Sequence, residues 1–320
     1  MNLDHAELPV VLIAGPTAVG KTAFSIDLAS LLDTEIVNAD SMQVYRFMDI
    51  GTAKPTPRER ALVKHHLLDV VRPDEPFDAA RYGELARPVL EELHRRGKVP
   101  VVVGGTGLYM KVLTRGICPG APGDHEVRER LLLREKEIGL RGLHEELARV
   151  DPVLGGRLHP NDRQRILRAL EVYQATGKRL SERQEEHRFE GSLYRTVKIF
   201  LTLERDEIYE RIDRRVHRMI EEGFLDEVAR LLDMGFGPDL RPMQSLGYRQ
   251  LARHLGEGWP LDEAIHDIQK ETRRYAKRQM TWFRGDPEFR WFDARHTEEI
   301  MDWAVRRVRS LSGGADAEGE

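Results

Sequence analysis

An apolar run at residues 10–14 leads directly into the octapeptide GPTAVGKT at residues 15–22, which fits the pattern G-x-x-x-x-G-K-[ST]. The residues after it have the apolar periodicity of a helix, so the expected order is strand, glycine loop, helix. Such a loop points backbone N–H groups at an anion, the helix N-terminus adds partial positive charge, and Lys21 adds a full charge. The hydroxyl of Thr22 is placed to join a Mg²⁺ shell that also takes phosphate oxygens. The sequence therefore predicts a diphosphate or polyphosphate site built from Gly15, Pro16, Thr17, Ala18, Val19, Gly20, Lys21 and Thr22.

The composition restricts the class of protein. Of the 320 residues, 40% are hydrophobic and 32% are charged, which is typical of a soluble globular chain. The net charge is −4, so binding to a nucleic acid would need local basic patches instead of an overall positive field. Cys118 is the single cysteine, which excludes an intramolecular disulfide framework and a zinc site made of several cysteines. The N-terminal sequence lacks the basic start and long apolar run of a signal peptide, so we expect a cytoplasmic protein.

Short apolar runs at 10–14, 35–38 and 99–103 predict buried parallel strands, because helical stretches separate each run from the next. A fourth run, 197–203, comes much later in the chain. The pattern predicts an α/β fold: a P-loop open parallel sheet flanked by helices, with an inserted all-helical subdomain.

The insertion is expected to begin near a Gly/Pro-rich hinge at 116–123 and to end near 191–192. We expect a P-loop core at 1–117 plus 193–311 and a helical insertion domain at 118–192, with helices at 125–150 and 163–175. From 206 onward the chain reads as almost entirely helical, with breaks at 235–238 and 256–260. Residues 312–320 are typical of a disordered acidic tail.

Polar residues follow the expected strands at the edge where ligands bind in parallel α/β sheets. Asp40 could hold Mg²⁺ through water or act as a general base, and a helix N-cap is the structural alternative. Gly104 and Gly105 let a ligand approach the backbone, and Thr106 offers a hydroxyl donor or a helix cap. This third strand lacks the metal-binding acid that an ordinary NTPase would carry there, so simple ATP hydrolysis fits poorly.

Basic residues gather at 157–188 and 270–284, and the second segment also contains Tyr275, Trp282 and Phe283. Unstacked bases pack on aromatic rings and guanidinium planes, so this mixture favours nucleic-acid binding. Solvated helix faces and core aromatics are the alternatives. His65 and His66 lack matching metal ligands, so we expect them to be packed or to form caps.

Longer strings extend these motifs over residues 10–285. The most specific are DSMQ at 40–43, DIGTAKP at 49–55 and KRQMTW at 277–282, and further strings lie at 65–69, 103–109, 159–162, 168–172 and 245–250. In this order they resemble the bacterial tRNA dimethylallyltransferases, which prenylate adenine-37 next to the anticodon. The single cysteine fits the absence of the zinc-finger extension that eukaryotic relatives carry.

The resemblance implies transfer of a dimethylallyl group from dimethylallyl diphosphate to N6 of adenine-37, in tRNAs reading codons that begin with U. The products would be N6-dimethylallyladenosine and diphosphate. The phosphate loop would hold the diphosphate of the prenyl donor with Arg215 closing over it, while Lys21 and a Mg²⁺ cofactor stabilise the departing charge. Asp40 would act as general base on the N6 proton, and Thr106 would hydrogen-bond the amine or Asp40.

The resemblance also implies which residues contact the anticodon stem-loop of the tRNA. They are Asp40, Ser41, Met42, Gln43, Thr106, Arg128, Gln164, Arg165, Ile166, Leu167, Arg168, Gly247, Tyr248 and Arg249, with the stretch 277–284. The insertion would clamp the anticodon stem by moving about its hinges, and we expect the enzyme to act as a monomer.

Two other functions share parts of this pattern. A kinase of small molecules or nucleotides would share the loop and the sheet, would consume ATP without tRNA, and would want an acid after the third strand. A non-enzymatic tRNA-binding protein, in which the loop is structural, would bind tRNA and ignore dimethylallyl diphosphate.

Overall fold

The computed structural model describes residues 8–116, 125–187 and 193–312. The chain divides into two compact units, one formed by Met1–Thr114 with Ser192–Glu320 and the other by Arg115–Gly191. The expected hinge at 117–123, Cys118 and the tail at 313–320 lie outside the described residues. Among the described helices, none is both long enough and apolar enough to cross a lipid bilayer.

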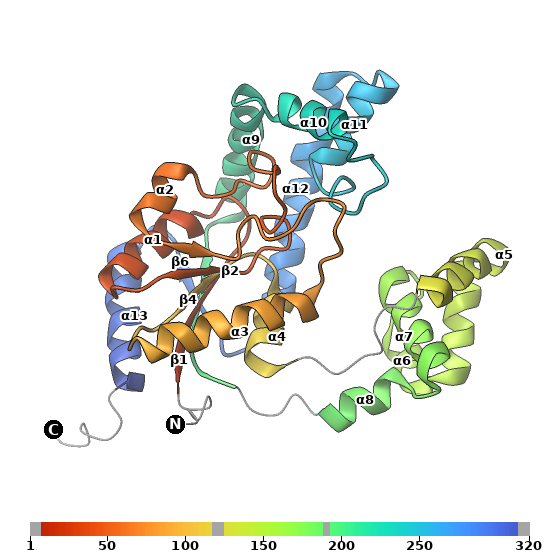
Figure 1. The fold of residues 1–320 in the computed structure, drawn as a ribbon, viewed down its shortest axis with the longest axis horizontal. Helices are drawn as coiled ribbons and strands as arrows, with labels where there is room; N and C mark the ends of the chain where they lie inside the picture. The colour runs from red at the N-terminus through yellow and green to blue at the C-terminus, as the bar shows by residue number, and fades with distance from the viewer. Residues whose placement is uncertain (1–7, 117–124, 188–192, 313–320) are drawn as a thin grey trace. The chain divides into compact units, whose positions relative to one another are not determined.

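A six-stranded parallel sheet forms the centre of the first unit, which we call the α/β unit (Figure 1). Its order is β3-β2-β4-β1-β5-β6. The strands are β1 (Pro9–Ala14), β2 (Ile36–Asn38), β3 (His65–His66), β4 (Val101–Val103), β5 (Arg195–Thr202) and β6 (Arg290–Asp293). Every residue of β1 is buried, as expected of a central strand covered on both faces. The α/β fold class is confirmed.

The two outermost strands were not expected from the sequence. β3 has only two residues, and β6 has the sequence RWFD, in which no residue is fully buried. The prediction that residues after 206 are almost entirely helical is therefore wrong at β6. Edge strands have one free side and need no continuous apolar run, so the hydrophobic pattern does not reveal them.

Helices cover the sheet and extend beyond it. α1 (Lys21–Leu31) packs on β1, β2 and β4, and α13 (Thr297–Ser312) packs on β1 and β5. α9 (Arg205–Glu221), α10 (Phe224–Asp233), α11 (Tyr248–Glu257) and α12 (Leu261–Arg284) pack on one another and form one group beside the sheet (Figure 1). The remaining helices of this unit are α2 (Pro57–Leu62), α3 (Ala79–Arg95) and α4 (Gly107–Arg115). The expected break near 256–260 lies where Gly258 (φ 71°) ends α11 in a left-handed conformation that favours glycine.

The described part of the second unit, which we call the helical unit, consists of four helices. They are α5 (His125–Val150), α6 (Pro152–Arg157), α7 (Arg163–Thr176) and α8 (Leu180–His187). Asp151 and Asp162 cap α6 and α7 by accepting backbone N–H groups, which explains why these helices begin where they do. The unit has its own apolar core, which includes Leu143, Leu147 and Ile166.

Candidate active site

A cavity of about 1250 Å³ opens in the α/β unit and is lined by the phosphate loop, the segment after β2, the end of β4 and one face of α9. Parallel strands end at the same edge of a sheet, which is why segments distant in sequence meet here. Lys21, Thr22, Asp40 and Arg215 all line it. The structure therefore brings together the phosphate loop and the candidate general base.

The phosphate loop is bent by unusual backbone conformations. Ala18 (φ 68°) and Gly20 (φ 105°) both lie in the left-handed region, and Gly20 is the N-cap of α1. Lys21 Nζ donates to the carbonyl oxygens of Gly15 and Pro16, at 2.9 Å in each case. Burial and the nearby Arg215 lower the pKa of Lys21 to about 8, although Asp40 acts in the opposite direction. The ammonium group is thus held against the loop, at the wall of the cavity.

Arg215 comes to the phosphate loop from α9. Its Nη1 donates to Thr17 Oγ1 at 3.3 Å, across 198 residues of sequence. Burial lowers the pKa of Arg215, and Asp40 opposes this shift. Since a guanidinium stays charged in proteins, Lys21 and Arg215 place two cations beside the loop.

Asp40 is oriented by its own turn. Its Oδ1 accepts the N–H of Met42 at 2.9 Å, and a methyl group placed on Gly105 would lie 3.8 Å from its Oδ2. Thr106 bonds to Ser41, the residue after Asp40: its Oγ1 accepts the Ser41 N–H at 3.0 Å and lies 3.3 Å from Ser41 Oγ. The segments after β2 and β4 are therefore fixed together.

Gly104 makes this junction possible. A Cβ at this position would lie 2.1 Å from the Ala39 carbonyl oxygen, and the Thr106 N–H donates to that same oxygen at 3.1 Å. Gly104 thus allows the neighbouring strand end to approach closely, and the predicted approach of a ligand to Gly104 and Gly105 stays a prediction.

The donor set at the cavity fits a Mg²⁺ ion that is carried largely by a phosphate ligand. Within residues 8–116, 125–187 and 193–312, no three His, Cys, Asp or Glu side chains form a group that could hold a metal. Thr22 and Asp40 line the same cavity and offer a hydroxyl and a carboxylate. Mg²⁺ commonly takes one or two protein oxygens together with phosphate oxygens and water. The Mg²⁺ cofactor and the role of Thr22 stay predictions.

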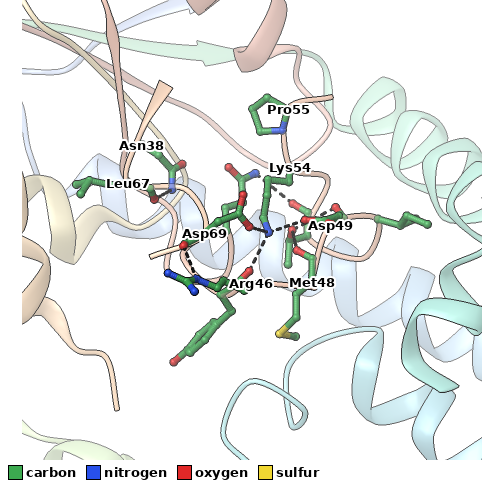
Figure 2. A network of polar contacts seen from close by, with 12 residues as sticks. Asn38, Arg46, Met48, Asp49, Lys54, Pro55, Leu67 and Asp69 are labelled. Carbon is green, nitrogen blue, oxygen red and sulfur yellow. Dashed lines mark hydrogen bonds and ion pairs between the residues drawn. The ribbon is translucent and has the colours of Figure 1, made fainter. Parts of the chain in front are cut away.

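Lys54 organises another wall of the cavity and was not among the predicted site residues. Figure 2 shows its amino group between two carboxylates: Nζ lies 2.6 Å from Asp49 Oδ1 and 2.7 Å from Asp69 Oδ1. It also donates to the Tyr45 carbonyl at 2.8 Å, and Arg60 binds the other oxygen of Asp69 at 2.8 Å. Burial alone would raise the pKa of Asp69, but the bonds from Lys54 and Arg60 lower it.

Glu227 anchors the adjoining loop at Asp49–Gly51 and was also missed. Its carboxylate, 2% exposed, accepts the N–H groups of Asp49, Ile50 and Gly51 at 2.7–3.2 Å. The hydroxyl of Tyr248 donates to it at 2.6 Å. Tyr248 was a predicted tRNA contact, yet its side chain is buried in this network, which leaves the exposed Arg249 as the accessible member of that motif.

The other predicted tRNA contacts of the 40–43 and 247–249 motifs are also held in place by the fold. Gln43 lines the cavity and donates to the carbonyls of Thr52 and Ala53, while Ser41 and Met42 are half-buried. Gly247 (φ 89°) is the N-cap of α11, where a Cβ would lie 2.7 Å from the ring of Phe224.

The predicted contacts of the helical unit divide into a buried set and an exposed set. Ile166 and Leu167 are fully buried in its core, so their side chains cannot touch RNA directly. Arg128 Nη2 donates to Gln164 Oε1 at 3.0 Å, and Arg128 and Arg168 both pair with Glu171 at 3.4 and 3.0 Å. The polar contacts available to a ligand are therefore Arg128, Gln164, Arg165 and Arg168.

The structure also shows the surroundings of the two adjacent histidines and of the aromatic residues on α12. His65 Nδ1 lies 2.8 Å from the Val63 carbonyl oxygen, and His66 Nε2 lies 2.6 Å from Glu35, so both are packed residues of β3. On α12, Phe283 is a core residue, Tyr275 lines the cavity, and Trp282 is 38% exposed.

Comparisons with known proteins agree with the motifs. The profile of the IPP transferase family matches residues 43–286. A tRNA dimethylallyltransferase from Syntrophobacter fumaroxidans is 65% identical, over 96% of this chain and 90% of that protein. One from Geobacter sulfurreducens is 51% identical, over 91% and 94% of the two chains.

Solved structures give the same result. A tRNA isopentenylpyrophosphate transferase from Bacillus halodurans superposes with a TM-score of 0.71 at 40% identity, covering 96% of this chain and 98% of that one. A eukaryotic dimethylallyltransferase acting on tRNA gives a TM-score of 0.78 at 30% identity, covering 95% and 78%. The resemblance predicted from the motifs is confirmed: the chain belongs to the tRNA dimethylallyltransferase (IPP transferase) family.

Proposed function

We propose that this enzyme transfers the dimethylallyl group of dimethylallyl diphosphate to N6 of adenine-37, in tRNAs reading codons that begin with U. The products are N6-dimethylallyladenosine and diphosphate. The observation that carries the proposal is the single cavity in which Lys21 and Arg215 lie beside a phosphate loop and Asp40 lies at the adjacent strand end.

The loop and its two cations suit the departure of diphosphate. When the allylic C–O bond breaks, its electron pair leaves with the diphosphate oxygen and carbocation character develops on the carbon. Backbone N–H groups of the loop, Lys21 and Arg215 are already in place where that negative charge grows, so little reorganisation is needed. Mg²⁺, bound through Thr22 and phosphate oxygens, would supply further positive charge to the leaving group.

Asp40 suits the other half of the reaction. The N6 lone pair of adenine is delocalised into the ring, so this amine is a weak nucleophile until its proton is removed. As the new C–N bond forms, the N6 proton moves to the Asp40 carboxylate, which the Met42 N–H holds in one orientation. Thr106 fixes the Asp40–Ser41 turn through its bonds to Ser41, and its hydroxyl is offered to the target adenine.

The helical unit supplies the residues for binding the anticodon stem. Arg128, Gln164, Arg165 and Arg168 present cationic and amide groups suited to phosphate oxygens. The target base must leave the anticodon-loop stack to reach the cavity, at a cost of a few kcal/mol that such contacts offset.

Transfer of labelled dimethylallyl diphosphate to unmodified tRNA tests this function. We expect the label on an adenine adjacent to the anticodon, with one diphosphate released for each base modified. A tRNA with guanine at this position is the matched control and should take no label. Label-free tRNA together with consumption of ATP and transfer of its γ-phosphoryl group to a small acceptor would support the kinase alternative instead.

We further propose that the enzyme acts as a monomer in the cytoplasm. The cavity is built by segments of one chain, so no second subunit is needed to complete it. Light scattering of the purified protein, with and without tRNA, should give the mass of one chain and of one chain per tRNA.

A further inference from the structure

Gln279 on α12 bridges two parts of the active site. Its side-chain oxygen Oε1 accepts the Thr17 N–H at 2.9 Å, and its Nε2 donates to the Gly105 carbonyl oxygen at 3.1 Å. Gln279 is only 5% exposed and lies in the wall of the cavity, and its bond to Gly105 is buried. A buried amide that satisfies two backbone groups from distant segments is costly to replace.

The two bridged segments serve the two halves of the proposed reaction. Thr17 lies in the phosphate loop, and its hydroxyl receives the bond from Arg215. Gly105 precedes Thr106, whose hydroxyl fixes the turn that carries Asp40. Gln279 therefore links the phosphate loop, which is proposed to bind the donor, to the segment that orients Asp40, the proposed proton acceptor.

Gln279 packs directly against the Gly105 segment. A Cβ on Gly105 would lie 2.2 Å from Gln279 Nε2, so glycine at this position lets the amide reach the backbone. The bridge needs one acceptor and one donor on the same side chain, which glutamine provides and methionine does not. Because its polar atoms face protein backbone, Gln279 is not suited to reading RNA, although it lies within the 277–284 stretch.

We propose that Gln279 is a positioning residue that fixes the separation between the phosphate loop and the Gly105–Thr106 segment. The proposal rests on the proposed function, since it assigns the bridge to aligning the allylic carbon of the donor with N6 of the acceptor. Each half of the site keeps its own binding groups without the bridge. Loss of the bridge therefore affects alignment more than binding.

The test compares Gln279→Met with Gln269→Met in the full-length enzyme. Gln269 is a matched control: it lies on the same helix, is 9% exposed, and its Nε2 lies 3.1 Å from His217 Nε2, and neither residue is among those that line the cavity. We expect Q279M to lower the single-turnover rate of prenyl transfer by about 10- to 100-fold, since misplacement by about 1 Å has effects of this size. The Kd values for tRNA and for the unreactive donor dimethylallyl thiodiphosphate should stay within about threefold of wild type.

Other outcomes discriminate among the roles of the residue. Q269M should keep the wild-type rate, and both variants should show a similar, modest fall in Tm. Gln279→Asn keeps the amide but is one methylene shorter, so we expect a smaller loss of rate than in Q279M. Full activity of Q279M, a loss confined to the two Kd values, or unfolding of both Gln279 variants would overturn the proposal. A wild-type enzyme that transfers no prenyl group would instead refute the proposed function.

Discussion

The charged side chains at the cavity of the α/β unit and the exposed arginines of the helical unit are held in different ways. In the α/β unit, the Lys54 side chain is 1% exposed and is paired with two carboxylates, and Lys21 is held against loop carbonyls. In the helical unit, Arg165 is 70% exposed and pairs with Asp162, the N-cap three residues before it, at 3.4 Å. Buried charges are expensive but have fixed positions, which suits chemistry. Exposed charges attract a polyanion over a distance and need no fixed geometry.

The largest expected effect concerns Asp40 in the α/β unit. Asp40→Asn retains an oxygen that can accept the Met42 N–H but cannot take a proton. We expect the rate of label transfer to fall by about 10²- to 10⁴-fold. The Kd for tRNA, measured by filter binding, should stay within about threefold of wild type. The control is Asp33→Asn at an exposed site paired with Lys98, which should be fully active. If D40N prenylates tRNA normally, Asp40 is not the base.

The second prediction concerns the stability contributed by the Lys54 network. Lys54→Met would remove the buried ammonium that the partly exposed Asp49 and Asp69 share, while Asp69 would keep its pair with Arg60 (Figure 2). We expect the free energy of unfolding to fall by about 3 kcal/mol, a value at the lower end for broken buried pairs because both carboxylates keep some exposure. Urea unfolding measures this change. Lys98→Met, which removes a pair with the fully solvated Asp33, should alter it by less than about 0.5 kcal/mol, and equal stability of the two variants would remove the contrast between buried and exposed pairs.

The third prediction uses the lowered pKa of Lys21. Near pH 8 the free enzyme holds this ammonium only about half of the time, whereas a bound diphosphate favours the charged form. Donor binding then takes up a proton, so affinity should be flat below about pH 7 and should fall above about pH 8, by at most about tenfold per pH unit. Calorimetry with dimethylallyl thiodiphosphate measures the slope. Lys21→Met should bind more weakly with no such slope, and a slope that persists in K21M would assign it to another group.

The smallest effect is expected for the exposed charges of the helical unit. Arg165→Ala should change the unfolding free energy by less than about 0.5 kcal/mol. It should weaken binding of an anticodon stem-loop and reduce the slope of log Kd against log salt by about one. Arg141→Ala is the matched control, because Arg141 is an exposed arginine of α5 outside the predicted contacts. Equal salt slopes for R165A and R141A would argue against a specific contact by Arg165.

The features that could be predicted from the sequence are those that depend on residues close to one another along the chain. The phosphate loop is contiguous, and the central strands β1, β2, β4 and β5 are apolar runs, so the fold class and the meeting of the loop with Asp40 could be predicted. The caps that begin α6 and α7 are local signals of the same kind.

The residues that hold the site together were not predictable in this way. Gln279 contacts Thr17 across 262 residues, and Glu227 contacts Asp49 across 178, so no local pattern marks either of them. Lys54 lies in the motif at 49–55, but its pair with Asp69, fifteen residues later, could not be predicted from that motif. Ile166 and Leu167 show the opposite error: they were predicted to contact tRNA because they lie in a motif with polar residues, but both are buried in the core.

The most direct measurement is a crystal structure of the enzyme with dimethylallyl thiodiphosphate and an anticodon stem-loop. We expect the diphosphate on the N–H groups of residues 15–22 beside Lys21 and Arg215, and the extruded adenine with N6 within hydrogen-bond distance of Asp40. A diphosphate bound elsewhere, or an adenine whose N6 faces away from Asp40, would contradict the central claim that one cavity joins the prenyl donor to its acceptor base.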